Sequence, residues 1–415
     1  MRASYRNCVS HAACRASPPG AEGSGAWQAF TGEALREPTT IDEIRDLMAQ
    51  SGDRLLTHDP VWVAARGPNA SGGDNAEPVY GLRRNGRMLG YAAFVRGART
   101  LRFAIGELTL YRHLVPSLTL VHDVTLAAAS EAERIGQICD LLALLALHAA
   151  PRRALFLEGV PTESALFAAA TQRLAGSGWI VVRLGESYEH QFADLPPSYE
   201  LYERQLGGRS RQSLRYSRRK LLEHVDGALR ACCFAERRDV AAFVAAAQAI
   251  SKKTYQWNLL DLGLRDAATL AARLELAADH GWMRCYILYC RDEPVAFMLG
   301  YVYCGVYYYM DIGYDPAWAK WSVGSILQME VVKDLLSSDD PPSRFDFSTG
   351  FGSHKARFGN AARQEANILM LPAGLFYRLI ARGYRVSVVL DKKAGAAADA
   401  LGIKTRLKKW LRRVG

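Results

Sequence analysis

The fold is decided by residues 283–313, MRCYILYCRDEPVAFMLGYVYCGVYYYMDIG. Three apolar and aromatic runs, at 283–289, 295–303 and 306–313, are separated by turn residues at 291–294 and by a Cys-Gly pair. Runs of this length between turn signals are typical of β-strands joined by hairpins. The stretch therefore predicts a three-stranded antiparallel meander. The residues after it predict a helix at 322–336 and a final core strand at 343–347.

The N-terminal half has a similar organisation. Two apolar runs, 79–84 and 88–95, flank Asn85 and Gly86, a pair that tolerates the positive φ of a tight hairpin turn. Further helices and strands of this half are expected at 40–49, 101–103, 118–124, 131–149, 154–157, 162–174 and 179–184. Because the two hairpins resemble one another, we interpret the chain as a weak internal duplication. The predicted fold class is α/β (α+β): two tandem modules, each a mixed, mostly antiparallel sheet flanked by helices.

Two consecutive prolines, Pro196 and Pro197, interrupt this pattern and indicate a boundary. The first 25 residues have no apolar core of the kind that a signal peptide requires. We therefore expect five segments: a disordered leader (1–25), an N-terminal module (26–195), a basic helical segment (196–226), a C-terminal module (227–372) and a helical basic tail (373–415).

Composition is that of a soluble globular protein. Of the 415 residues, 49% are hydrophobic and 23% are charged, and no apolar run approaches the roughly 20 residues needed to cross a bilayer. None of the cysteines forms a CxxC pair or has a histidine at zinc-ligand spacing. We expect reduced structural cysteines, a cytoplasmic protein and no metal.

The net charge of +10 is concentrated in two segments, 204–220 and 402–415, neither of which contains an acidic residue. At 100° per residue, a helix places four arginines of the first segment in one sector: Arg211, Arg215, Arg218 and Arg219. Such a face is a solvated surface, a nucleic-acid contact or a clamp for an anionic ligand. In the second segment, Trp410 and Leu411 lie among basic residues. The tail therefore either docks at a membrane surface or packs on the second module.

The start of the helix at 322–336 is a candidate donor site. Its first turn contains Ser322, Val323, Gly324 and Ser325. Unpaired backbone N–H groups and the positive end of the helix dipole can hold a pyrophosphate there, and glycine allows its close approach. A serine and a glycine at a helix start are also ordinary capping residues.

Two motifs near the end of the second module carry a family resemblance. They are Phe-Asp-Phe-Ser-Thr-Gly at 345–350 and His-Lys-Ala-Arg-Phe-Gly at 354–359. Together with Gly-Tyr-Asp-Pro at 313–316 and the basic helix, they resemble the CelD/FemAB-like GNAT acyltransferases over roughly 55–371. The resemblance implies a pair of GNAT-like modules, the first commonly degenerate. It also implies acyl or aminoacyl transfer in cell-envelope or exopolysaccharide assembly, and it favours an anion clamp between the modules.

The resemblance also suggests roles for single residues. Asp346 is a general base toward an attacking amine, or a partner for Lys355 or Arg357. Lys355 stabilises the oxyanion of a tetrahedral intermediate, whereas Arg357 belongs to the anion-binding set. Asp311 and Tyr314 end the last meander strand, where GNAT enzymes often place acid–base groups, although they can equally be turn residues. Residues 351–354 depart from the family, which tends to show an acidic pair and a tyrosine there.

The sequence thus predicts an acyltransferase that moves an acyl group from acyl-CoA to an amine or hydroxyl of an envelope sugar or related metabolite. One alternative is a FemX-like aminoacyl transferase that uses charged tRNA as its donor. The other is a non-catalytic component of a polysaccharide biosynthesis or export system. A cytoplasmic protein, peripheral to the inner membrane through its tail, is expected.

Overall fold

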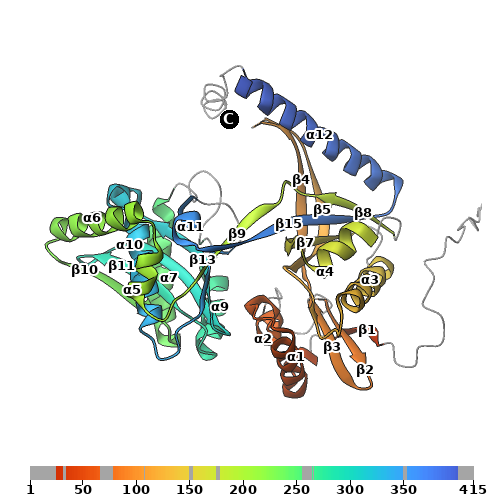
Figure 1. Ribbon diagram of the computed structural model, residues 1–415, viewed down its shortest axis with the longest axis horizontal. Helices are drawn as coiled ribbons and strands as arrows, with labels where there is room; N and C mark the ends of the chain where they lie inside the picture. The colour runs from red at the N-terminus through yellow and green to blue at the C-terminus, as the bar shows by residue number, and fades with distance from the viewer. Residues whose placement is uncertain are drawn as a thin grey trace, which may run out of the picture.

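A computed structural model describes residues 25–30, 34–65, 78–106, 108–148, 153–173, 178–254, 264, 266–348 and 353–400. Figure 1 shows two lobes bridged by two strands, β9 (Tyr188–Asp194) and β15 (Ala361–Pro372). Both lobes combine mixed sheets with flanking helices, so the predicted fold class is confirmed. The expected leader falls outside the described residues apart from Gly25, and the basic end of the tail, 401–415, falls outside them entirely.

The C-terminal lobe contains the predicted meander. Its strands follow one another across the sheet as β10 (Leu229–Phe234), β11 (Cys285–Cys290), β12 (Glu293–Tyr303), β13 (Val306–Tyr314) and β14 (Arg344–Asp346). Helices α7 (Val240–Lys253) and α9 (Ala267–Asp279) cover one face. The other face is covered by α5 (Tyr199–Gln205), α6 (Gly208–His224) and α10 (Val323–Leu336). Tyr307 and Tyr309 pack beneath α10, as expected of strand residues with core-facing rings.

The N-terminal lobe contains two sheets. The smaller consists of β1 (Ala26–Phe30), β2 (Val79–Arg84), β3 (Arg87–Ala93) and β6 (Thr125–Leu126). The predicted Asn85-Gly86 turn joins β2 and β3, and both residues have positive φ. The short strands expected near 101–103 and 118–124 are instead parts of one long hairpin, β4 (Val95–Ile105) and β5 (Leu108–Val121). The polar and basic residues along this hairpin hid its length from the sequence pattern.

The remaining elements of this lobe surround the long hairpin. They are α1 (Pro38–Ser51), α2 (Pro60–Ala64), α3 (Glu131–His148), β7 (Ala154–Pro161), α4 (Ala165–Ala168), β8 (Trp179–Arg183) and the C-terminal helix α12 (Leu375–Ala400). The helix expected at 162–174 is short in the structure, because after α4 the chain continues as a π-helical segment, Ala169–Arg173.

Strands β9 and β15 join the lobes into one 11-stranded sheet, and neither was predicted from the sequence. Strand β9 pairs with β14 of the C-terminal lobe. Strand β15 pairs first with β9 and then with β7 and β8 of the N-terminal lobe. The last strand of the C-terminal module therefore completes the sheet of the other lobe.

Hydrophobic packing also crosses between the lobes. One core cluster contains Leu47 and Trp62 of the N-terminal lobe together with Phe243 and Tyr301 of the C-terminal lobe. The rings of Trp62 and Tyr301 meet edge to face, with their centroids 5.0 Å apart. The lobes thus share backbone hydrogen bonds and a continuous apolar core.

Candidate active site

A wedge opens between β13 and β14. The two strands pair in parallel only from Val306 to Tyr308, because β14 ends at Asp346 while β13 continues to Tyr314. A bulge in the ladder between β12 and β13 leaves Met310 without a counterpart in the register, and such a bulge bends its strand locally. A cavity of about 610 Å³ lies between the unpaired end of β13 and the start of α10.

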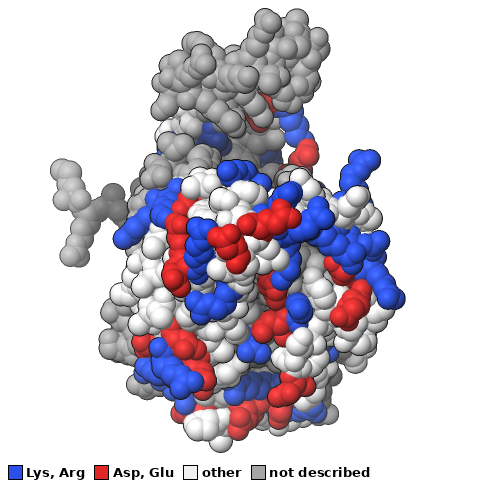
Figure 2. Space-filling view, turned by 90° about the vertical axis from the view of Figure 1, so that its left-hand side faces the viewer, with Lys and Arg blue, Asp and Glu red and all other residues white. Residues whose placement is uncertain are grey.

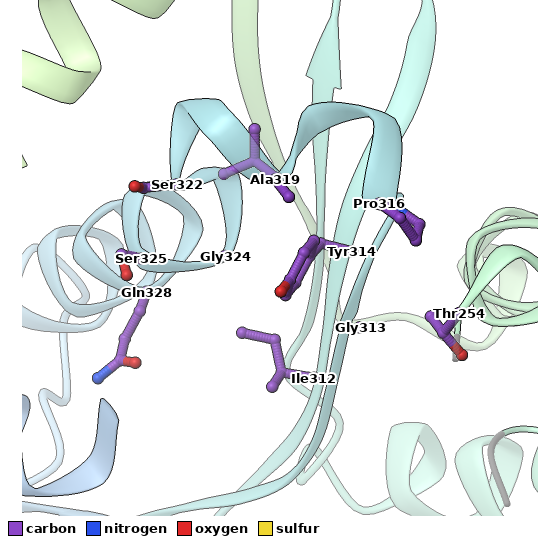
Figure 3. A pocket seen from close by; sticks show the side chains of 11 residues that line it. Thr254, Ile312, Gly313, Tyr314, Pro316, Ala319, Ser322, Gly324, Ser325 and Gln328 are labelled. Carbon is purple, nitrogen blue, oxygen red and sulfur yellow. The ribbon is translucent and has the colours of Figure 1, made fainter. Parts of the chain in front are cut away.

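The predicted donor-site residues line this cavity. Ser322, Val323, Gly324 and Ser325 all line it, together with Ile312 and Tyr314 of β13. Figure 3 labels these residues apart from Val323. Ser322 is the N-cap of α10, with a positive φ of 57° and no side-chain capping hydrogen bond. The first-turn backbone N–H groups are therefore not occupied by a cap from this side chain, which leaves donors for a bound anion.

Gln328 is a cavity residue that sequence reasoning missed. It lies one turn beyond Gly324 on α10 and lines the same cavity (Figure 3). Its side chain is almost fully buried, at 1% exposure, and its Nε2 group has no hydrogen-bond partner among the residues that the structure describes. An orphaned buried amide costs free energy unless a ligand satisfies it. The available signal was a glutamine placed directly between the apolar residues Leu327 and Met329 of the predicted helix.

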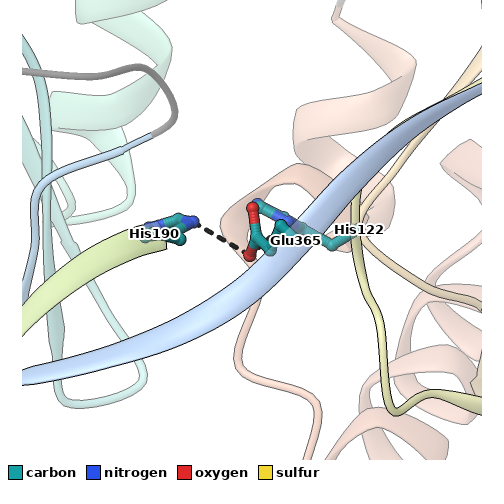
Figure 4. Close-up of side chains that lie close together, drawn as sticks. All are labelled: His122, His190 and Glu365. Atoms are coloured by element: carbon teal, nitrogen blue, oxygen red, sulfur yellow. Dashed lines mark ion pairs between the residues drawn. The ribbon is translucent and has the colours of Figure 1, made fainter. Parts of the chain in front are cut away.

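Asp346 lies in a buried chain of acidic and imidazole groups. Its Oδ1 atom accepts hydrogen bonds from His190 Nε2 at 2.6 Å and from the Ser348 backbone N–H at 2.7 Å. The other ring nitrogen of His190 lies 2.9 Å from Glu365 Oε1 (Figure 4). Burial raises the pKa of Asp346, but the hydrogen bond and charge of His190 outweigh it and hold this pKa below its usual range.

The same buried acidic groups determine the charge of His190. Burial lowers the pKa of His190, but its contacts with Asp346 and Glu365 raise the pKa to about 9, so the ring is an imidazolium at neutral pH. We had expected Lys355 or Arg357 as the alternative partner of Asp346. The histidine takes that place because β9 lies next to β14 in the sheet.

His122 completes this cluster. Its Nδ1 atom lies 3.1 Å from the Gly159 carbonyl oxygen and 3.8 Å from Glu365. The possible ligand atoms of His122, His190 and Glu365 lie within 4.8 Å of one another, and side chains of these types bind metal ions elsewhere. Here the carboxylate of Glu365 already has two cationic neighbours, His190 and Arg363.

Lys355 is buried close to Asp346. The lysine lies on α11 (Ser353–Phe358), is 8% exposed, and donates from Nζ to the Ser348 carbonyl oxygen at 3.1 Å. Burial lowers the pKa of Lys355, while the nearby charge of Asp346 opposes that shift. Arg357 points elsewhere and donates to the Ser210 carbonyl oxygen at the start of α6. The structure thus brings Lys355, but not Arg357, to the Asp346 end of β14.

Asp311 and Tyr314 face opposite sides of β13. Asp311 lies across the ladder from Leu299, which packs on the α7 side of the sheet. Burial raises the pKa of Asp311 to about 6. Tyr314 turns to the other side, where it lines the donor cavity next to Gly324.

A second cavity, of about 700 Å³, lies between the lobes. The C-terminal lobe contributes Tyr308 and Asp346, whose side chains share one face of the sheet. The cavity is polar, and its charged lining comes from both lobes: Asp53, Arg54, Asp123, Arg134, Arg344 and Arg363. Burial raises the pKa of Asp123 to about 6. This cleft places acids and arginines around the Asp346 end of β14.

The arginine helix does not lie in that cleft. In Figure 1, α6 lies on the outer flank of the C-terminal lobe, and it packs on α10 through Leu214 and Leu221. Figure 2 shows that flank as a mixture of basic and acidic side chains. Arg215 pairs with Glu203 at 2.6 Å and Arg218 with Glu330 at 2.8 Å. The expectation of a clamp between the modules was therefore wrong, because docking on α10 turns the helix outward.

The remaining arginines of the set have local contacts. Arg219 lies 3.8 Å from Glu223, and Arg211 donates to the Arg204 carbonyl oxygen at 3.4 Å. A shallow pocket on this flank is lined by α6 itself, including Arg211, Arg215 and Arg219. The arginines that do face the cleft come from elsewhere in the chain and had no local sequence signal.

Comparisons with known proteins agree with this geometry. Residues 208–356 match the family described as "Acetyltransferase (GNAT) domain". This segment of the chain therefore resembles a GNAT acetyltransferase domain. This match includes the meander, α10 and the Asp346–Lys355 region, and it confirms the family expected from the sequence. No curated protein matches the chain.

Solved structures extend the likeness beyond that segment. FemX superposes with a TM-score of 0.54 at 10% identity, covering 81% of this chain and 98% of FemX. A tandem GNAT protein from the clavulanic acid biosynthesis pathway gives 0.49 at 13% identity, with 84% and 99% coverage. The C-terminal domain of a putative lysylphosphatidylglycerol synthetase from Agrobacterium fabrum gives 0.46 at 13%, with 83% and 95% coverage. The two-lobed fold is thus shared with FemX.

Proposed function

We propose that this protein transfers an acyl group from acyl-CoA to an amine or hydroxyl group of an acceptor held between the lobes. The orphaned amide of Gln328, buried beside an open helix N-terminus, carries the donor part of this proposal. Phosphate oxygens fit the first-turn N–H groups of α10, and amide or thioester carbonyls of the acyl-CoA fit the Gln328 Nε2 donor. The cavity volume of about 610 Å³ is ordinary for a ligand of this size class.

Residues of this chain supply the remaining functions of the site. When bound, acyl-CoA supplies an activated acyl group as a thioester. Asp311, with a pKa of about 6, accepts the proton that the attacking amine or hydroxyl loses. The Lys355 ammonium stabilises negative charge that develops on the carbonyl oxygen. Asp346, held ionised by His190, keeps that ammonium in place rather than acting as the base.

The lining of the cleft and the family resemblance support the proposed acceptor class. Carboxylates and arginines from both lobes suit a ligand that carries hydroxyl groups and an anionic group. An envelope or exopolysaccharide sugar, or a related metabolite, has this chemistry. A cytoplasmic protein near the inner membrane would meet such acceptors during polysaccharide biosynthesis.

The FemX-like fold supports a second candidate, aminoacyl transfer from charged tRNA. The exposed basic face of α6 is a surface on which an RNA backbone would bind. In that case, changing Arg211 and Arg215 to alanine should weaken RNA binding and reduce its salt dependence. A chain that binds neither donor would be a non-catalytic component of a polysaccharide system.

The donor proposal is tested by Gly324→Val and Gln328→Met with acetyl-CoA in a calorimeter. A Cβ atom at Gly324 meets Tyr314 at 3.4 Å, an ordinary contact, so the fold tolerates a side chain there while valine fills the cavity. Loss of one hydrogen bond from Gln328 should weaken binding about ten-fold. The free energy of unfolding should not fall in Gln328→Met, because no protein partner is lost.

Gly136→Val is the matched control, since Gly136 has open space around it on α3. Ligands that copurify with the wild-type chain, identified by native mass spectrometry, provide an independent readout. Acetyl-CoA affinity unchanged in both cavity variants would move the donor site elsewhere.

A further inference from the structure

The C-terminal helix α12 has a second apolar face that nothing in the described chain covers. The helix packs on the N-terminal lobe through Tyr377, Ile380, Ala381 and Tyr384, which join β4 and β8 in one core cluster. In Figure 1 it runs along the outer edge of that lobe. A helix of this kind ordinarily turns a polar face to water. The outward face of α12 departs from that pattern.

Exposed apolar side chains form a stripe along this face. The members are Leu375, Leu379, Val386, Val389 and Leu390, each between 46% and 75% exposed. At 100° per residue they fall within a sector of roughly 100°, on the side opposite the packed residues. Single exposed apolar residues are common on proteins, but a continuous stripe marks an interaction surface.

Basic residues accompany the stripe. Arg378, Arg382 and Lys393 are exposed and lie within it or along its edge. Asp391 is the sole acidic residue between 375 and 396, and its carboxylate accepts a hydrogen bond from the Gly106 backbone N–H. The charge presented beside the apolar stripe is therefore positive.

The tip of the β4–β5 hairpin lies beside the C-terminal part of α12. The contact of Gly106 with Asp391 joins the tip to the helix. Four exposed apolar side chains lie near the tip: Leu108, Leu110, Tyr111 and Leu114. Of the fifteen large hydrophobic residues that are exposed in the described chain, ten lie on α12 or β5. The exposed apolar area is therefore concentrated at one end of the molecule.

We propose that α12 and the hairpin tip bind the surface of an anionic lipid bilayer. The apolar stripe would lie at the boundary between headgroups and acyl chains, while arginine and lysine reach the phosphates. No helix in the described residues is long and apolar enough to span a membrane, which fits a helix that lies in the interface plane. A second copy of the chain fits less well, since pairing two such faces would bring like charges together.

The full-length protein should be tested by co-sedimentation with vesicles. One set contains phosphatidylcholine alone, and the other contains phosphatidylcholine with about 30% phosphatidylglycerol, a composition chosen to carry the negative charge of a bacterial membrane surface. We expect binding to the anionic vesicles only. The variant Leu379→Glu/Val386→Glu should lower the partition coefficient about ten-fold or more, because it removes apolar area and adds negative charge. Arg378→Gln/Arg382→Gln should lower it about five-fold for each charge removed.

Leu147→Glu on α3 is the matched control, because Leu147 is 82% exposed but far from α12 in the chain. All variants keep residues 401–415, so any contribution of the basic tail is the same in each. The proposal would be overturned if Leu147→Glu and Leu379→Glu/Val386→Glu lowered vesicle binding equally, or if neither variant lowered it. Equal binding to both vesicle types would refute the role of charge. A lipid-free dimer that Leu379→Glu abolishes would assign the face to a second copy instead.

Discussion

Asp311 combines a near-neutral pKa with a place beside the bulge of β13. Burial holds its pKa at about 6, so a base at this position becomes ionised as the pH rises through that value. We expect kcat/KM to increase between about pH 5 and pH 7 and then to level off. Asp311→Asn should remove this limb of the pH profile and lower the plateau about 10²-fold. A wild-type limb that survives in Asp311→Asn would assign the base elsewhere.

Lys355 places its positive charge near the C-terminal end of β14. Lys355→Met keeps the aliphatic stem of this buried side chain and removes only the charge. If the ammonium stabilises the oxyanion, turnover should fall by about 10²-fold or more while KM changes little, because the interaction strengthens only in the transition state. Steady-state kinetics measures both parameters.

Asp346→Asn tests whether the two groups act together. If Asp346 acts through Lys355, the double variant should lose less rate than the product of the two single losses. Full turnover in a folded Lys355→Met protein would contradict the assignment of Lys355 to catalysis.

At the scale of elements, the meander depends on close packing across its strands. Gly300 of β12 lies at the bulge, and a Cβ atom there would collide with the Tyr307 hydroxyl group. Tyr307 is fully buried and donates to the Arg284 carbonyl oxygen, so it cannot move away freely. Gly300→Ala should lower the free energy of unfolding by about 1–3 kcal/mol. Gly97→Ala on β4 has open space and should be close to neutral in the same denaturant titration.

At the scale of the whole molecule, the lobes share strand β15 and a continuous apolar core. Neither lobe can lose its structure without breaking the sheet of the other, so we expect one cooperative transition rather than two. Differential scanning calorimetry should give a van't Hoff enthalpy close to the calorimetric enthalpy. Two resolved transitions would show that the shared strand does not couple the lobes.

The sequence by itself determined the parts of this protein that depend on local pattern. Three strands joined by short turns follow from the apolar runs of 283–313, because hairpin pairing requires only neighbouring segments. The sequence also brought together Ser322–Ser325, which line one cavity, because one helix start carries them all. Their role as a donor site stays a prediction. The FemAB-like motifs likewise lie within one short stretch.

Only the tertiary structure decided what depends on pairing between distant segments. His190 reaches Asp346 across 156 positions of sequence, because β9 pairs with β14 at the junction of the lobes. The outward direction of α6 and the uncovered face of α12 depend on which side of each helix packs, and amphipathic periodicity alone does not identify the partner. The contacts that connect the lobes are long-range, and their location is set by the whole sheet rather than by any local segment.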